Sequence, residues 1–156
     1  MRPARVPIGL HLAQAARVVS RAFDEALAAA GGSLPVWLVL LNIKTQQLAN
    51  QRELAEAVGI REATLTHHLN AMEAEGLITR QRHEANRRIH VVQLTDAGEA
   101  AFVRLRDAAI AFDRRLRRGF ADAELAALAD ALNQLARNVG GADGRLPWAG
   151  LAEDQS

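Results

Sequence analysis

The chain has 156 residues, of which 49% are hydrophobic and 24% are charged, an ordinary balance for a globular protein of one domain. Its formal net charge is only +1, so the protein as a whole is not a polycation. The absence of cysteine excludes a disulfide framework, a thiol nucleophile, a cysteine redox sensor and a thiolate zinc site. No segment reaches the roughly 18 apolar residues of a membrane span, so we expect a cytoplasmic protein.

The first third of the chain predicts two helices. Residues 8–30 place apolar side chains at helical spacing, and Gly31-Gly32 ends this segment. Ser33 then caps a second helix, which has Pro35 near its first turn and is almost wholly apolar. We therefore expect the second helix to lie buried at the centre of the domain.

The middle of the chain predicts a helix, a tight turn, a second helix and a hairpin. The first helix begins with a capping box at Asn50 and ends at Gly59, and the second runs from about Arg61 to Glu75. Two strands follow at 78–83 and 89–94. Such a helix pair suits insertion into a DNA major groove, and a basic hairpin beside it suits the adjacent minor groove.

A helical wheel separates the faces of the second of these helices. Leu65, Leu69 and Met72 form a narrow apolar stripe that must be buried. His67 lies almost opposite this stripe, so we expect it to contact a base or a phosphate. His68 lies at the edge of the stripe, where packing against the preceding helix is the better interpretation. Adjacent histidines point about 100° apart on a helix, so this pair does not form a chelating site.

The residues of this helix predicted to contact DNA lie on or beside its outer face: Arg61, Ala63, Thr64, Thr66, His67 and Asn70. A small residue at Ala63 lets the backbone approach DNA closely. Arg61 occupies the N-cap position, where Ser, Thr or Asp would stabilise the helix by roughly 1 kcal/mol. Its side chain either reaches a phosphate or is a surface arginine without a role.

The hairpin is predicted to contact DNA through its arginines. From residue 77 to 92, four arginines stand against one glutamate, a net charge of +3 before any histidine is counted. Arg87 and Arg88 lie at the turn, which suits insertion into a narrow and strongly negative minor groove. Arg80 and Arg82 share one face of a strand and could flank the DNA backbone. Any one arginine could be a solvated surface charge, but four in one hairpin favour a shared role.

Two further helices are predicted in the C-terminal part. Thr95-Asp96 caps a long helix that reaches about Gly119. The last helix starts at Asp122 and spaces its apolar residues by alternating steps of three and four, as in a coiled-coil seam. The terminal helices carry more apolar surface than a small core can cover, so we expect a second copy to cover it. The alternative is that these helices fold back onto the core.

From Ser33 to about Gly98 the chain resembles the MarR family of bacterial winged-helix transcription regulators. The segments that carry the resemblance are ELAEAVGI, TLTHHLNAMEAEGLI and RRIHVVQLTDAG. The resemblance implies a mainly α fold with a small β-hairpin wing, in which a winged helix-turn-helix domain is flanked by N- and C-terminal dimerisation helices. Its parts are a winged domain at 33–95 and dimerisation helices at 8–30 and 97–139, within a single domain over 1–139. The resemblance does not cover residues 140–156, whose loop composition predicts a flexible tail.

The resemblance also implies partners and residue roles. Members form homodimers whose two recognition helices read a near-palindrome in double-stranded DNA. His67 stands where many members have a base-contacting arginine, and Arg87 and Arg88 fall on the wing-tip arginine positions. Asn86 replaces the aspartate that usually braces the tip arginine, and an amide braces it more weakly.

Many members bind small aromatic acids in a cleft between the dimerisation helices and the winged domain. The resemblance implies that side chains of the first two predicted helices could approach such a cleft: His11, Gln14, Arg17, Trp37 and Asn42. The alternative for Trp37 is ordinary packing, and for the polar residues it is exposure to solvent.

The expected function is a dimeric, sequence-specific DNA-binding regulator, a repressor relieved by a small aromatic or phenolic ligand, with no cofactor. A winged-helix protein-interaction module is the main alternative. A metal-responsive regulator is the second, because His11, His83 and His90 are unassigned, although their spacing is not zinc-like. An enzyme is the weakest alternative, since the sequence has no Gly-rich phosphate loop and no plausible nucleophile with a base.

Overall fold

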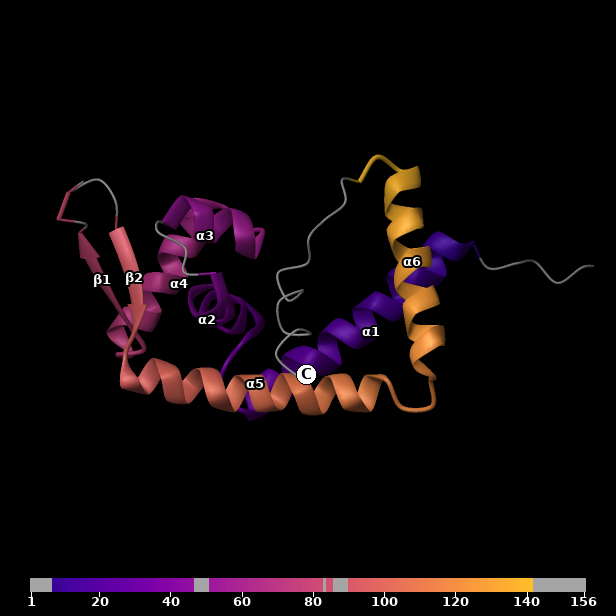
Figure 1. Ribbon diagram of the computed structural model, residues 1–156, viewed down its shortest axis with the longest axis horizontal. Helices are drawn as coiled ribbons and strands as arrows, with labels where there is room; N and C mark the ends of the chain where they lie inside the picture. Colours follow the sequence, from indigo (N-terminus) through magenta and orange to yellow (C-terminus); the bar gives the residue numbers. More distant parts are fainter. Residues whose placement is uncertain (1–6, 47–50, 83, 86–89, 142–156) are drawn as a thin grey trace, which may run out of the picture.

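The computed structural model describes residues 7–46, 51–82, 84–85 and 90–141, which form six helices and a two-stranded antiparallel hairpin (Figure 1). In chain order the elements are α1 (Ile8–Ala29), α2 (Leu34–Gln46), α3 (Gln51–Val58), α4 (Glu62–Ala74), β1 (Ile78–Arg82), β2 (His90–Leu94), α5 (Asp96–Leu116) and α6 (Asp122–Asn138). Each predicted element is present with bounds shifted by only a few residues. The predicted mainly α fold with a β-hairpin wing is confirmed.

The apolar helix α2 lies at the centre of the core, as its sequence predicts. Trp37, Val39, Leu40 and Leu41 are buried, and the helix contacts α1, α3, α4, α5 and β2. The Ser33 hydroxyl accepts a hydrogen bond from the backbone N–H of Val36 at 3.4 Å, which caps its first turn. Along the described stretches no single helix is long and apolar enough to cross a membrane; α1 and α2 pass that test only as a pair bent by 76°.

The long helix α5 joins the winged part of the molecule to α1 (Figure 1). Near its beginning, Phe102 stacks on Trp37 of α2 with ring centroids 5.7 Å apart. Two turns beyond Leu105, Phe112 stacks on Phe23 of α1 at 4.9 Å. Aromatic pairs at these separations stabilise packing beyond their area burial. The helix therefore contacts α2 near one end and α1 nearer the other.

A compact junction fixes the beginning of α5 to the turn that follows α4. The backbone N–H of Thr95 donates to the Leu77 carbonyl at 3.0 Å, and the Thr95 hydroxyl donates to the Gly76 carbonyl at 2.5 Å. The same hydroxyl accepts from the N–H of Gly98 at 3.1 Å, which confirms the predicted cap. A Cβ atom at Gly98 would lie 2.0 Å from the Leu77 carbonyl oxygen, so only glycine permits this approach.

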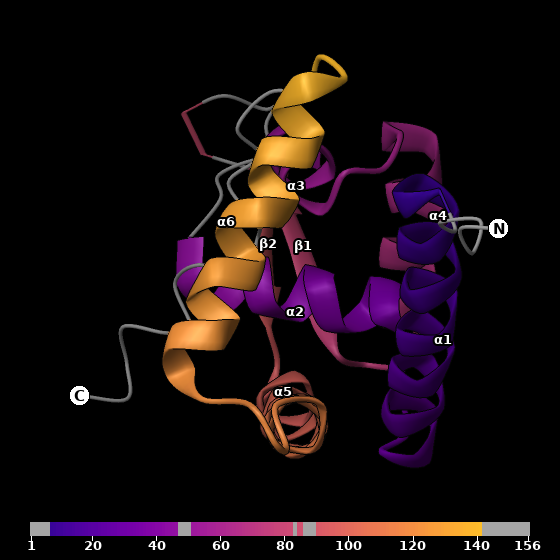
Figure 2. The same cartoon turned by 90° about the vertical axis from the view of Figure 1, so that its right-hand side faces the viewer.

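The helix α6 stands apart from the core. It rises at the end of α5 away from the wing, and the view along α5 shows α6 and α1 on opposite sides of that helix (Figures 1 and 2). None of its residues is buried, and Val139 remains 85% exposed. The two helices together line an apolar groove whose residues are Ile8, Gly9, Leu12, Leu132, Leu135, Ala136 and Val139. Within the described residues, the alternative in which α6 folds back onto the core is wrong.

Candidate nucleic-acid interface

The helix α4 presents one buried face and one exposed face. Leu65, Leu69 and Met72 are almost completely buried, which confirms the predicted apolar stripe. His67 is exposed and His68 is half-buried, as the wheel predicts. Their rings lie 5.9 Å apart, inclined at 63°, so the two histidines point in different directions.

The other residues predicted to contact DNA from α4 are exposed: Arg61, Ala63, Thr64, Thr66 and Asn70. Arg61 occupies the N-cap position with an extended backbone and makes no side-chain capping hydrogen bond. The hydroxyl of Thr66 donates to the Glu62 carbonyl at 2.9 Å and accepts from the side chain of Gln51 at 3.4 Å. Thr66 therefore links the beginning of α3 to α4, and its hydroxyl is partly occupied.

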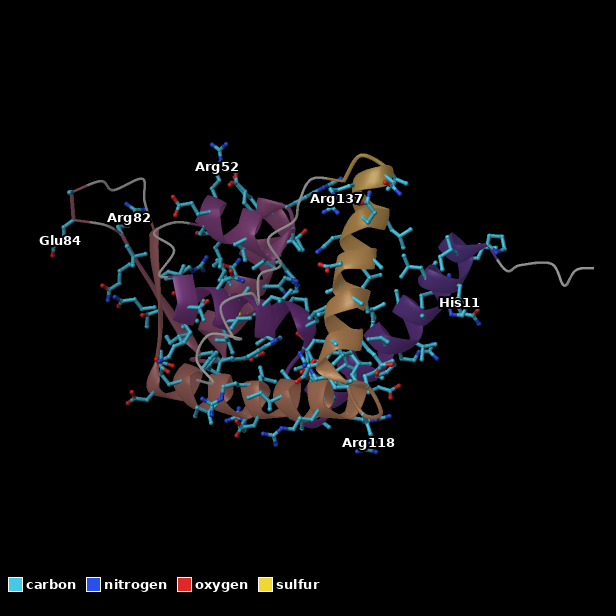
Figure 3. All side chains as sticks on the ribbon, turned by 45° about the vertical axis from the view of Figure 1, so that its right-hand side comes forward. His11, Arg52, Arg82, Glu84, Arg118 and Arg137 are labelled. Atoms are coloured by element: carbon cyan, nitrogen blue, oxygen red, sulfur yellow. The ribbon has the colours of Figure 1, made fainter. Side chains whose placement is uncertain are left out.

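The helix α3 supports α4 from behind. Leu54, Ala55 and Val58 of α3 are buried in the same core as the α4 stripe. Gly59 follows with φ +77°, a left-handed conformation that glycine adopts without steric cost and that closes the helix-turn-helix. On the solvent side Arg52 forms an exposed i,i+4 pair with Glu56 (Figure 3), which contributes little to stability.

The two strands of the wing are held in register by the core. Ile78 pairs with Leu94, and the buried side chains of Ile78 and Val92 anchor the hairpin. Arg80 and Arg82 share a strand face, but their environments differ. Arg82 is exposed and points away from the body (Figure 3), whereas the side chain of Arg80 is only 19% exposed.

Arg80 is bound to the flank of α4. Its Nη2 donates to Asn70 Oδ1 at 2.5 Å and to Glu73 Oε2 at 2.6 Å, and its Nε donates to the same Glu73 oxygen at 3.0 Å. These hydrogen bonds lower the pKa of the Glu73 carboxyl below its ordinary value; desolvation opposes the shift and the guanidinium charge adds to it. Arg80 thus joins the wing to α4, and in this structure its donors are turned toward protein rather than toward solvent.

Sequence reasoning missed Glu73. Glu73 stands seven residues before Arg80, on the flank of α4. The residues predicted to contact DNA lie on the neighbouring outer face. The sequence does place an acidic residue at the end of the helix, shortly before a strand that carries arginine. That pattern could have predicted an ion pair between the helix and the strand. A helical wheel gives the angular position of Glu73 on α4. Which residue Glu73 contacts depends on the path of β1.

Several predicted residues fall outside the described part of the chain. These are Asn86, Arg87 and Arg88 at the wing tip and His83; the side chain of His90 is likewise not described. The expected contacts of the wing tip with DNA stay predictions. Of the segment between the strands, Glu84 is described and is exposed (Figure 3).

The five residues predicted to approach a ligand cleft are not brought together. Trp37 is 3% exposed and stacked on Phe102, and Asn42 is completely buried. His11, Gln14 and Arg17 are exposed on α1, and His11 lies on the part of α1 remote from the winged domain (Figure 3). Leu27, where α1 is buried, lies roughly 24 Å farther along the helix axis than His11. Trp37 is therefore packed in the core and the three α1 residues face solvent, as the alternative interpretation predicts for them.

The metal-responsive alternative gains no support from the geometry. In the part of the chain that the structure describes, no three His, Asp or Glu side chains are grouped so that they could hold a metal ion. His11 stands alone on an exposed face of α1.

Comparisons with known proteins agree with this architecture. The MarR family model matches residues 33–90, from the end of the α1–α2 turn to the start of β2. The crystal structure of the transcriptional regulator PA3341 is 28% identical, with 85% of this chain and 98% of that chain covered and a TM-score of 0.71. The transcriptional repressor CouR bound to a 23-mer DNA duplex is 28% identical, with 83% and 92% covered and a TM-score of 0.70.

A further neighbour supports the fold alone. CouR from Rhodococcus jostii RHA1 bound to p-coumaroyl-CoA is 22% identical in its alignment, which covers 87% of this chain and 96% of that chain, with a TM-score of 0.69. The helix-turn-helix, the hairpin and the flanking helices are thus a shared architecture.

Proposed function

We propose that this chain is a member of the MarR family, whose model matches residues 33–90, and that it is a homodimeric, sequence-specific DNA-binding repressor, released by a small aromatic or phenolic ligand in the cytoplasm. The family consists of DNA-binding transcription regulators and not of enzymes. The observation that carries the proposal is the geometry of α4. Its apolar stripe is fully buried, its outer face is exposed, and the arginine-bearing strand β1 lies against its flank.

The two kinds of DNA contact come from different parts of this surface. Ala63, His67 and Asn70 form the outer face of α4, where side chains can meet base edges in a major groove. Arg61 at the start of α4 and Arg82 on β1 are exposed and suit phosphates. Phosphate contacts supply much of the affinity and base contacts supply the selectivity. The DNA duplex bound to CouR, a protein 28% identical to this chain, supports DNA binding as the function.

The open apolar surface of α1 and α6 supports the homodimer. The groove formed by Ile8, Leu12, Leu132 and Val139 exposes side chains that water solvates poorly. A second copy related by two-fold symmetry would cover both grooves and place two α4 helices for successive major grooves, about 34 Å apart. The matching operator is then a near-palindrome.

Release by a ligand requires two dimer geometries. A ligand dissociates the complex only if it binds better to a dimer whose recognition helices are wrongly spaced for DNA. CouR from R. jostii RHA1, which shares this fold, is bound to p-coumaroyl-CoA, a molecule that carries an aromatic group. For this chain we propose an effector of the aromatic or phenolic class. Its cleft is not assigned to the five residues predicted from the sequence, because these do not lie together.

The test is a binding titration with the genomic DNA immediately upstream of the coding region. Fluorescence anisotropy should show one preferred inverted repeat, two chains per site, and an affinity that falls about a thousandfold or more between about 50 and 200 mM salt. Aromatic acids and their thioesters, added to the complex, should identify the effector by loss of anisotropy. A shallow salt dependence without preference for any DNA sequence would instead favour a protein-interaction module.

A further inference from the structure

We infer that Arg80 determines base specificity indirectly, by fixing the orientation of the Asn70 side-chain amide. Held in this way, the amide presents its NH₂ group outward, so α4 favours guanine or thymine over adenine at the contacted position and rejects cytosine. The inference rests on the proposed DNA-binding function and names the chemistry of one position in the half-site.

The orientation of the amide follows from the chemistry of its partner. A guanidinium group has five N–H donors and no acceptor, so the Asn70 atom that lies 2.5 Å from Arg80 Nη2 must be the oxygen. The Asn70 nitrogen therefore points away from Arg80. Among the described residues no acceptor is found for this NH₂ group, and the side chain is exposed on the outer face of α4.

Arg80 is itself firmly held, so the orientation does not depend on a single bond. Two of its nitrogens donate to Glu73 Oε2, at 3.0 and 2.6 Å, and charge-assisted bonds of this kind are among the strongest in proteins. The strand that carries Arg80 is anchored by Ile78, 1% exposed, and Arg80 pairs in register with the buried Val92. The guanidinium thus arrives at the flank of α4 from a fixed direction.

The major-groove edges of the bases respond differently to an outward NH₂ group. Guanine offers two adjacent acceptors, N7 and O6, and thymine offers O4, so each can receive protons from the NH₂ group. Adenine also offers N7, but its N6 amino group stands beside that acceptor, so an outward NH₂ group gains one bond there and meets a second donor. Adenine is normally read by asparagine through both amide atoms, the oxygen accepting from the N6 amino group. Asn70 could do this only by turning its oxygen toward the groove and giving up the bond to Arg80. Cytosine presents a donor, N4, which meets another donor.

The experiment measures base preference in a library of operators randomised over one half-site, with binding read by sequencing. Asn70→Ala identifies the position, since preference there is lost. At that position the wild type should prefer guanine or thymine over adenine by about tenfold. Arg80→Met frees the amide to rotate, and adenine should come within about twofold of the preferred base. Arg82→Met is the matched control, because it removes the same charge from the same strand face without touching Asn70; it should lower affinity uniformly.

A second variant keeps the test independent of any effect of Arg80→Met on folding. Asn70→Asp retains the pairing with Arg80 but replaces the donor by an acceptor, so preference should move to cytosine and adenine, which offer their N4 and N6 amino groups. Thermal unfolding of each variant shows which are folded. Arg80→Lys, which still donates to the Asn70 oxygen, should keep the wild-type preference.

The outcomes separate this inference from the proposed function. A wild type without any sequence preference overturns both. A wild type that binds specifically but prefers adenine or cytosine at the Asn70-dependent position overturns the inference alone. The same holds if Asn70→Ala changes affinity without changing any base preference, or if Arg80→Met and Arg82→Met behave alike.

Discussion

Replacement of Asn42 by leucine should stabilise the protein. Asn42 is completely buried in α2, where its Nδ2 donates to the Leu38 carbonyl at 2.7 Å. Its Oδ1 is buried and has no hydrogen-bond partner among the described residues. Leucine has a similar size and no polar atom, so Asn42→Leu removes the unsatisfied acceptor without opening a large cavity.

The magnitude follows from the groups involved. An unsatisfied buried acceptor costs roughly 1–3 kcal/mol, and the local bond that is lost contributes about 0.5–1.5 kcal/mol. The Leu38 carbonyl keeps its backbone partner in the helix, so no new unsatisfied group appears. The central values of these ranges differ by about 1 kcal/mol, which is the expected net gain in free energy of unfolding and is equivalent to a rise in Tm of roughly 2–4 °C for a chain of this length.

The assay is thermal and urea unfolding of wild type and Asn42→Leu at one fixed protein concentration, since dimerisation makes stability depend on concentration. Thr45→Val is the matched control. Thr45 lies on the same helix and its hydroxyl donates to the Leu41 carbonyl at 2.7 Å, but the residue is exposed. Its replacement should change stability by less than about 0.5 kcal/mol. If Asn42→Leu lowers stability by more than about 1 kcal/mol, the oxygen has a partner and the reasoning is refuted.

Three further predictions concern the two junctions of α4 and the α1–α6 groove. Gly98→Ala should reduce stability by more than about 2 kcal/mol in urea unfolding, because its Cβ would meet the Leu77 carbonyl oxygen at 2.0 Å; a neutral result would contradict the close approach. The pKa of Glu73 is lowered in the folded state, so its charged form adds stability above the ordinary carboxyl range, and this stability is lost as the pH falls through the folded value. The stability difference between wild type and Glu73→Gln should therefore be largest above the ordinary carboxyl range and shrink as the pH falls through the lowered pKa of Glu73, and a constant difference would argue against it. Leu132→Glu places a charge in the α1–α6 groove and should convert dimer to monomer in light scattering, with a parallel loss of DNA affinity; an unchanged mass would show that the groove is not the interface.

Local sequence patterns predicted the parts of the interface that one helix determines alone. The stripe of Leu65, Leu69 and Met72 and the opposite exposures of His67 and His68 follow from a period of 3.6 residues, so they needed no tertiary information. The network of Arg80 was not predictable in the same way. Its partners lie on another element, and the path of the strand decides whether a guanidinium meets a carboxylate or solvent.

The expected ligand cleft shows a second limit. The helix α2 is apolar around its whole circumference, so its sequence does not indicate which side faces a neighbour and which might face a cavity. Asparagine is usually exposed, so burial of Asn42 was expected neither from the family resemblance nor from its alternative, exposure to solvent. Contacts of α2 with five other elements bury it instead.

The junction between α4 and α5 makes α4 follow any rotation of α5. The helix α5 has 21 residues and is therefore roughly 32 Å long. Thr95 and Gly98 fix α4 to the beginning of α5, so the two helices move together. A tilt of α5 by about 5° about its C-terminal end would then shift α4 by roughly 3 Å. In a symmetric dimer both α5 helices tilt, and the distance between the two recognition helices changes by roughly twice that amount. An angular change too small to disturb the core is then enough to make the distance between the two α4 helices differ from the spacing of successive major grooves.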